Sequence, residues 1–131
     1  MLLDNRLLDK LTEEAKQSPR LRTHYNLHES LDAKAQRLFV ALEPGTPLPI
    51  HRHRSTNETQ MIIRGHIKAL FYNDQREIIE EIELNPSMGR YGVHIPKGQW
   101  HTLEVLESGS IILEVKDGPY TPSAPEDVLE L

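Results

Sequence analysis

The sequence predicts an all-β protein, a jelly roll or barrel, with a short N-terminal α-helix. Apolar residues recur at helical spacing only near the N-terminus, and the rest of the chain alternates short strand-like runs with turn residues. Eight short strands at such a spacing are typical of a jelly roll or barrel. The 131 residues suffice for one domain with a real core and are too few for a second catalytic module.

The helix is expected over about residues 5–17. Leucines near the N-terminus recur with the period of one helical face, Asp4 suits the N-cap, and Ser18-Pro19 ends the pattern. We interpret this helix as a cover for one end or edge of a sheet, in preference to a partner-binding helix. Residues 1–19 thus form a first segment that packs on the barrel.

The barrel is expected over residues 20–117. Turn residues such as Pro44-Gly45, Asn85-Pro86 and Ser108-Gly109 separate its strands. Residues 118–131 contain prolines and acidic residues and are expected to form an extended surface tail. The candidate strands lie near residues 36–43, 47–53, 58–64, 66–73, 77–83, 92–95, 100–106 and 110–116.

Two strand candidates are apolar on both faces, namely Met61-Ile62-Ile63 and Ile111-Ile112-Leu113. A sandwich strand that also meets a second subunit has this pattern, because its outward side chains are then buried as well. The sequence therefore predicts a homodimer.

Composition narrows the class of function. A net charge of −5 gives no broad basic surface, so nucleic-acid binding is not expected. No long apolar run or signal-peptide pattern is present, and we expect a soluble, cytoplasmic protein without a membrane partner. The absence of cysteine excludes thiolate ligands and iron–sulfur clusters, so any metal ligands must offer nitrogen or oxygen.

The most informative stretch is Gly45-x5-His51-x-His53-x4-Glu58-x6-Gly65. Because side chains alternate along a strand, His51 and His53 are expected on the same side. The four-residue gap before Glu58 is long enough to reverse the chain, so this carboxylate can return on the adjacent strand to the same point. The stretch therefore supplies three candidate metal ligands.

A fourth candidate ligand, His101, opens a strand after the turn Pro96-Lys97-Gly98. His51, His53, Glu58 and His101 together predict a site for one divalent transition metal per chain, and the donors do not distinguish Fe, Zn, Mn or Ni. Four protein ligands close a tetrahedron but leave two positions open in an octahedron, which is the arrangement that permits chemistry.

Strand alternation also predicts the surroundings of the ion. Gln60, Ile62 and Arg64 share parity with Glu58, and Leu103 and Val105 share parity with His101. The floor of the site is therefore expected to be mostly apolar with a few polar groups. Gln60 is expected either to hydrogen-bond a ligand or metal-bound water, or to orient the carboxylate.

The metal stretch resembles the first cupin motif, and Pro96, Gly98 and His101 resemble the core of the second. Two positions depart from that motif: Gly89 lies seven residues before the proline where six is usual, and Val105 replaces a frequent asparagine. From about residue 20 to 120 the sequence more specifically resembles the WbuC family of cupin-fold metalloproteins, often encoded among surface-polysaccharide genes. The resemblance implies a double-stranded β-helix barrel that binds metal. The segments that carry it include residues 22–28, 39–45 and 114–120.

The polar segment before the first candidate strand is a predicted ligand site. Alternation places Arg20, Arg22, His24, Asn26 and His28 on one face, where guanidinium and imidazole groups suit a phosphate or carboxylate. The resemblance includes three of these positions. The alternative is an edge strand that its charges protect from aggregation. The candidate ligand-binding residues are Arg22, Asn26, His28, Gln60, Lys116 and Tyr120.

Two classes of function fit these residues. The first is a metal-dependent isomerase or epimerase acting on a small anionic carbohydrate or related metabolite, with His28 as the candidate base. Surface-polysaccharide biosynthesis is the context that the resemblance implies. The second is a non-catalytic module that binds or senses a small ligand through the same ion. An iron-dependent oxygenase is a further variant, since open positions on iron can bind dioxygen.

Overall fold

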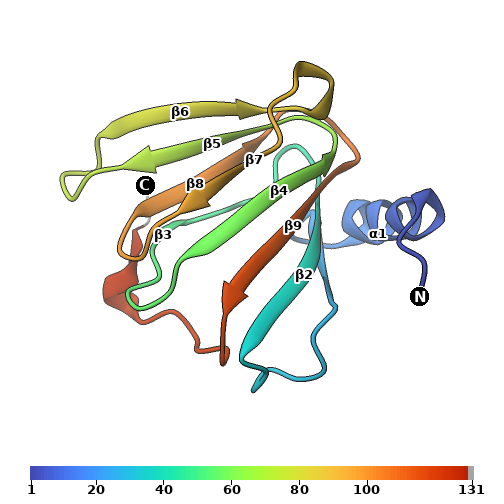
Figure 1. Cartoon of the computed structure of the whole chain (residues 1–131). Coiled ribbons are helices and arrows are strands. Elements are labelled where there is room, and N and C mark those ends of the chain that lie inside the picture. The colour runs from blue at the N-terminus through green and yellow to red at the C-terminus, as the bar shows by residue number, and fades with distance from the viewer. Residues whose placement is uncertain (130–131) are drawn as a thin grey trace.

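The computed structural model describes residues 1–129, which form two five-stranded antiparallel sheets and one N-terminal helix (Figure 1). The helices are α1 (Asn5–Gln17) and the 3-10 turns η1 (Pro86–Met88) and η2 (Pro125–Asp127). The strands are β1 (Arg22–Asn26), β2 (Ala35–Leu42), β3 (Ile50–His51), β4 (Glu58–Arg64), β5 (Ile67–Tyr72), β6 (Ile78–Leu84), β7 (Gly92–Ile95), β8 (Trp100–Val105), β9 (Ser110–Asp117) and β10 (Val128–Leu129).

Neighbouring strands in both sheets are mostly distant in sequence. Sheet A has the order β1-β2-β9-β4-β7 and sheet B the order β10-β3-β8-β5-β6. The chain therefore crosses repeatedly between the sheets, as in a jelly roll. The predicted all-β class with one N-terminal helix is confirmed.

The main core lies between the sheets. Alternate side chains of β2, β4 and β9 in sheet A meet those of β5 and β8 in sheet B, as expected for a sandwich. Gly65, between β4 and β5, has φ +97°, and a Cβ there would lie 2.3 Å from Ser110 Oγ. The core residues are Val40, Leu42, Ile62, Ile67, Ala69, Leu84, Val93, Ile95, Val105 and Ile112.

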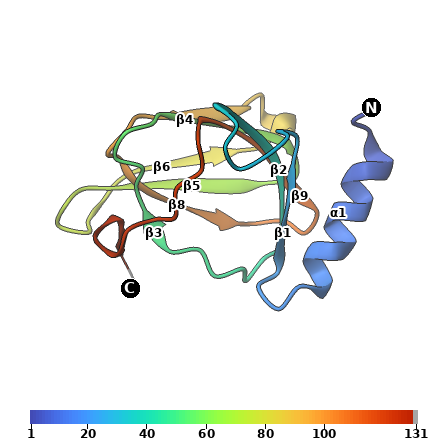
Figure 2. The ribbon, with the colours of Figure 1, turned by 90° about the horizontal axis from the view of Figure 1, so that it is seen from below.

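Helix α1 covers part of the outer face of sheet A (Figure 2). Its Leu8, Leu11 and Ala15 pack with Phe39 and Ile111 in a second apolar cluster. Asp4 is the N-cap, and its carboxylate accepts a hydrogen bond of 3.3 Å from the N–H of Leu7. The predicted bounds and covering role of the helix are both confirmed.

The prediction that Arg64 faces the metal site is wrong. A β-bulge between Ile62 and Arg64 shifts the register against β9, so the strict alternation ends there. Arg64 consequently points to the helix side, where it donates to Asp9 at 2.8 Å and to Thr12 at 2.9 Å. Ile62 keeps the predicted inward position.

Two short edge strands were not among the eight candidate strands. The predicted polar segment contains β1, which pairs with β2 along five residues. The predicted extended tail contains β10, where Val128 pairs with His51 of β3. Strand β3 itself comprises only two of the seven residues predicted for it. Strand β10 forms through pairing with a segment distant in sequence, which local patterns do not show. Strand β1 pairs with the next strand along the chain.

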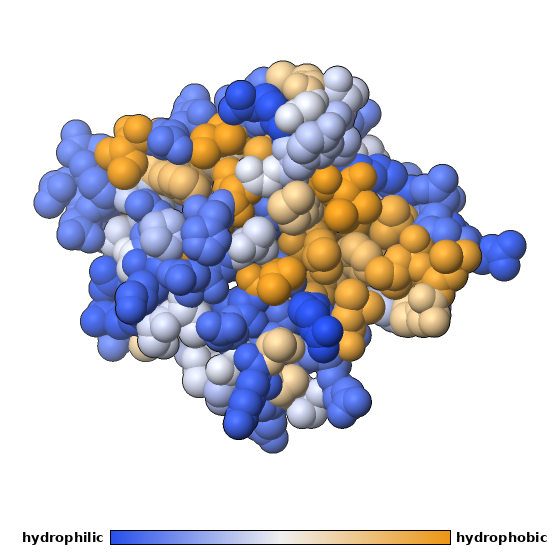
Figure 3. Space-filling view, in the orientation of Figure 1, coloured by the Kyte–Doolittle hydropathy of each residue, from blue (hydrophilic) through white to orange (hydrophobic). Residues whose placement is uncertain are grey.

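The rest of the outer face of sheet A carries apolar side chains that α1 leaves uncovered. Met61 and Ile63 of β4 are 36% and 41% exposed, and Val115 of β9 and Tyr91 before β7 are also exposed. Figure 3 shows apolar side chains gathered over this face and along the helix. Among residues 1–129, no helix has the length and apolar character needed to cross a membrane.

Candidate metal centre

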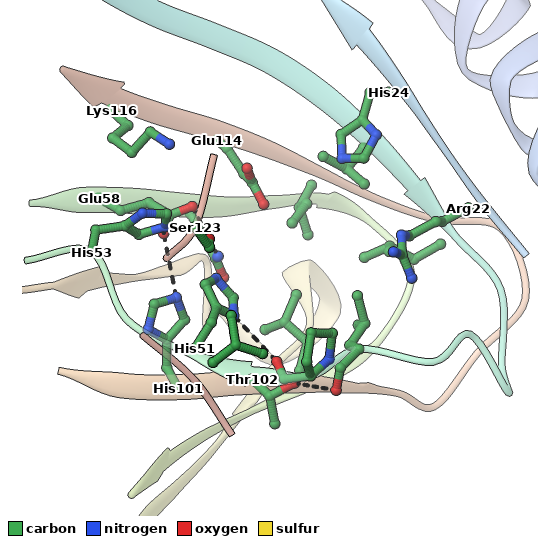
Figure 4. A pocket seen from close by; sticks show the side chains of 18 of the residues that line it. Arg22, His24, His51, His53, Glu58, His101, Thr102, Glu114, Lys116 and Ser123 are labelled. Atoms are coloured by element: carbon green, nitrogen blue, oxygen red, sulfur yellow. Dashed lines mark hydrogen bonds and ion pairs between the residues drawn. The ribbon is translucent and has the colours of Figure 1, made fainter. Parts of the chain in front are cut away.

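The structure brings the four predicted ligands together. His51, His53, Glu58 and His101 each offer one donor atom, and these atoms all lie within 4.8 Å of one another. The centroids of the three imidazole rings are 4.3 to 5.9 Å apart. Figure 4 shows the four side chains converging between the sheets.

The ligands come from both sheets. His51 and His101 are paired neighbours on β3 and β8 of sheet B, and His53 follows β3 in a loop. Glu58 opens β4, which belongs to sheet A. The prediction that Glu58 returns on the adjacent strand is therefore wrong, because residues 52–57 carry the chain across the sandwich, and the carboxylate faces the imidazoles from the opposite sheet.

Backbone carbonyls orient two of the imidazoles. His101 Nδ1 lies 2.8 Å from the carbonyl oxygen of Gln99, and His51 Nδ1 lies 3.2 Å from that of Pro49. A carbonyl oxygen only accepts, so each Nδ1 carries the proton and each Nε2 keeps its lone pair. Such carbonyl contacts commonly fix the orientation and tautomer of histidine ligands.

Glu58 completes the donor set as a buried carboxylate, 4% exposed. Its Oε2 atom lies 3.4 Å from Nε2 of both His53 and His101, and Gln60 Nε2 donates to Oε1 at 3.3 Å. Burial raises the pKa of Glu58, but the neighbouring imidazoles of His101 and then His53 outweigh burial and hold the pKa well below its usual value. The group is therefore an ionised ligand at neutral pH.

The donor atoms fit a metal ion. Glu58 Oε2 and His101 Nε2 are buried and have no hydrogen-bond partner among the described residues. Burial, and then the neighbouring His101, lower the pKa of His51 to about 4, so this imidazole is neutral in the pH range where it would bind an ion. Buried acceptors that face one another are unfavourable by themselves, and a cation among them satisfies all of them.

A cavity of about 330 Å³ opens from the four ligands toward β1. Arg22 and His24 lie across it from the histidines, and Glu114 lies between them (Figure 4). Val40, Leu103 and other core residues supply its apolar lining. Of the residues predicted for the floor, Gln60 and Leu103 line the cavity, whereas Ile62 and Val105 do not. Gln60 is buried in the same wall and bonds to Glu58, which matches the orienting alternative.

Glu114 is a site residue that the sequence analysis missed. It is paired with Gln60 across the β4–β9 ladder and shares a face with the predicted Lys116, so strand parity was the available signal. Burial, and then the charge of Glu58, raise the pKa of Glu114 to about 8, while Lys116 acts in the opposite direction. The pocket thus holds two carboxyl groups with opposite pKa shifts.

The other predicted ligand-binding residues lie in two places. Arg22 lines the metal pocket, whereas Asn26 and His28 line a neighbouring chamber. Lys116 and Tyr120 line both. The structure does not bring His28 to the metal ligands, and its role as the base stays a prediction.

Comparison with solved structures shows the fold. KdgF from Halomonas sp. is similar over 80% of this chain and 85% of its own, with a TM-score of 0.61 and 15% identity. CapF, a capsular polysaccharide assembling protein from Staphylococcus aureus, matches 87% of this chain with a TM-score of 0.67 and 21% identity. Oxalate decarboxylase from Bacillus subtilis matches 84%, with a TM-score of 0.57 and 17% identity. The two-sheet sandwich is therefore a cupin fold.

The chain spans about a third or less of two of these proteins, namely 32% of CapF and 28% of oxalate decarboxylase. Comparison with curated proteins finds no match. A family model described as "Domain of unknown function (DUF6016)" matches residues 3–84. Since this region is more than half of the chain, the protein belongs to the DUF6016 family.

Proposed function

We propose that this protein is a metal-dependent isomerase or epimerase that acts on a small anionic carbohydrate or related metabolite. The observation that carries the proposal is the convergence of four ligand side chains beside a pocket that also contains an uncoordinated carboxyl group, Glu114. The DUF6016 family and the cupin fold leave the reaction open, because this fold hosts many chemistries.

Three imidazoles and one carboxylate suit one divalent transition ion, with Fe, Zn, Mn and Ni all compatible. When bound, such an ion supplies Lewis acidity toward a carbonyl or hydroxyl oxygen of the substrate. Substrate binding and proton transfer are assigned to side chains of the protein itself.

The charges around the pocket favour an anionic substrate. The four ligands contribute one negative charge, from Glu58, so a divalent ion leaves the centre net positive. Arg22 and Lys116 add two cationic groups to the lining, against one acidic group, Glu114. Opposite charges attract strongly where protein shields them from water, so the pocket favours an anionic group such as carboxylate or phosphate.

Glu114 is the proton-carrying group of this proposal. In an isomerisation or epimerisation of this class, Glu114 in its ionised form takes a proton from a carbon beside a carbonyl and returns it to a carbon of the same substrate. No oxidant or further reactant is needed. Glu114 lines the metal pocket and His28 does not, so this geometry favours Glu114 over His28 as the proton-carrying group.

Two indications support a role in surface-polysaccharide biosynthesis. One is the sequence resemblance to the WbuC family, and the other is the similarity of the fold to CapF, which is a capsular polysaccharide assembling protein. We propose this context together with a cytoplasmic location, where sugar phosphates and nucleotide sugars are available as substrates.

The first test is elemental analysis of protein purified without an affinity tag or added metal. The metal-loaded protein is then incubated in D2O with a panel of sugar phosphates and nucleotide sugars, and the products are followed by NMR. Incorporation of deuterium at a carbon beside a carbonyl would support the proposal, provided that the Glu114→Gln variant no longer catalyses it. Saturable binding without product would favour the non-catalytic sensing module, and products dependent on iron and dioxygen would favour the oxygenase.

Substitutions separate the two kinds of site residue. His53→Ala and His101→Ala are expected to lower metal occupancy greatly, because each removes one of four donors. Arg22→Ala is expected to leave metal content intact and to weaken only the binding of the anionic ligand. Equal metal loss in all three variants would contradict this division of roles.

A further inference from the structure

A second chamber of about 500 Å³ adjoins the metal pocket. Both cavities are lined by His24, Glu114, Lys116 and Tyr120, so they share a wall made of these side chains. The second chamber lies beside the polar edge strand β1 and contains none of the four metal ligands. Its chemistry is therefore independent of the ion.

The register of β1 explains why this edge is polar on its inner face. His24 pairs with Val40 and Asn26 pairs with Leu38, whose side chains belong to the core between the sheets. Paired residues in an antiparallel ladder project to the same side, so both polar side chains face inward with the core. Both residues line the second chamber and are also exposed, so this chamber is open to solvent along the edge of the sheet.

His28 gives the chamber an unpaired ring nitrogen. The residue is 6% exposed, and its Nδ1 lies 3.1 Å from the N–H of Arg37 and 3.0 Å from the carbonyl oxygen of the same residue, so either neutral tautomer finds a partner there. Nε2 is buried and has no hydrogen-bond partner among residues 1–129. A buried polar nitrogen without a partner is unfavourable. With the proton on Nε2, an oxygen atom of a ligand satisfies this nitrogen while Nδ1 accepts from the N–H of Arg37.

Lys116 gives the chamber a cation at its junction with the metal pocket. It is paired with Glu58 on one side of β9 and with Gln36 on the other. The ammonium group forms no ion pair within 4.0 Å among the described residues. It is therefore available to a ligand that reaches past Glu114 from either cavity.

We propose that the ligand spans both cavities, with one oxygen-bearing end at the metal centre and an anionic oxygen group in the second chamber. There the anionic group, a carboxylate or a phosphate, pairs with Lys116 and accepts a hydrogen bond from His28 Nε2–H. This inference rests on the proposed function and narrows the substrate class to sugars that carry an acidic substituent away from the reacting carbon.

The test uses the full chain loaded with zinc, a diamagnetic ion. Glucose 6-phosphate, glucuronate, glucose and inorganic phosphate are titrated by calorimetry, and the ¹⁵N resonance of His28 Nε2 is followed by NMR. Binding of an acidic sugar is expected to shift this resonance. Lys116→Gln and His28→Phe are each expected to weaken binding of the acidic sugar roughly tenfold or more, since each removes a hydrogen bond to a charged group. Comparison of the two acidic sugars distinguishes phosphate from carboxylate.

Lys10→Gln, on exposed α1, is the matched control and is expected to bind like the native chain. An unshifted His28 Nε2 resonance at saturation, or unchanged affinity in both variants, would overturn the proposal. Absence of binding by any probe would overturn it as well. The resonance is read in the native chain, so the test does not depend on the variants folding. Zinc content, measured in the same samples, reports separately on the proposed metal centre.

Discussion

The backbone N–H of Gly98 donates a hydrogen bond of 2.7 Å to the carbonyl oxygen of His53. The turn that precedes His101 is thereby joined to the loop that carries His53, although the two segments are more than 40 residues apart. In the same region Lys97 N–H donates to Asn57 Oδ1 at 2.9 Å. Two of the four ligands are thus positioned by one another's loops.

Substitution of Gly98 by alanine is expected to weaken metal binding. Gly98 has φ +82°, where an L side chain costs about 1–2 kcal/mol, although within residues 1–129 no atom beyond the chain neighbours of Gly98 lies within 4 Å of the added Cβ. Relief of this strain moves the turn and, through its hydrogen bond, His53. Gly109→Ala is a matched control, because Gly109 also has φ +82° and open space around the Cβ. Urea unfolding should show a similar loss of stability in both variants, and metal titration should show weaker binding only in Gly98→Ala.

Metal binding is expected to stabilise the native chain and to lose this effect in His101→Ala. An ion that binds only the folded state at one hundred times its dissociation constant adds about 2.7 kcal/mol to the free energy of unfolding. His94→Ala is the control. His94 is exposed on β7, is not one of the four ligands, and its Nδ1 lies 3.0 Å from Thr59 Oγ1. Thermal unfolding with and without zinc measures the stabilisation in each variant. Equal stabilisation of His101→Ala and His94→Ala would contradict the assignment of His101 as a ligand.

Much of the fold and of the ligand set followed from the sequence because both rest on local periodicity. The bounds of α1 follow from its leucines and Asp4, and the identity of the four ligands follows from the spacing of histidine and glutamate around two turn motifs. Their placement does not follow from alternation alone, because His53 lies in a loop and Glu58 on the opposite sheet. Alternation failed where pairing overrides it. The bulge at Arg64 depends on the register against β9, and β10 exists only because it pairs with β3.

Glu114 escaped prediction for a related reason. Its position in the pocket depends on sheet order, because β9 lies between β2 and β4 and brings the carboxyl beside Glu58. An isolated glutamate on a strand gives no sign of such a neighbour. Parity with Lys116 identifies the correct face, but only the tertiary structure shows that this face lines the metal pocket.

Glu114 is expected to make the metal-free protein less stable as pH rises. Its folded pKa of about 8 exceeds the ordinary value of 4.5, so the folded state binds more protons between these values and the free energy of unfolding falls with rising pH. The slope is at most about 1.4 kcal/mol per pH unit. Glu114→Gln has no such proton. Urea unfolding in EDTA should therefore show the free energy of unfolding of the variant rising relative to that of the native chain from about pH 4.5 to 8. A constant difference across this range would contradict the shifted pKa.

The exposed apolar face of sheet A is the proposed interface of a homodimer. Met61→Lys and Ile63→Lys place charges on this face and are expected to yield monomers, since burial of an unpaired charge opposes association. Ile79→Lys is the control, because Ile79 is also an apolar exposed residue, 59% exposed, but lies on β6 of sheet B. Light scattering at micromolar concentration reads the mass directly, and a monomeric native chain would remove the proposal.

The ligands stand on both walls of the sandwich, with Glu58 on one and His51 and His101 on the other. An ion bound by these side chains would link the two sheets, and its radius and coordination preference would set the distance between the sheets at that end. Exchange of one ion for another would thus alter the width of the cavity as well as the reactivity inside. Metal supply in the cell would then influence which molecules the protein admits.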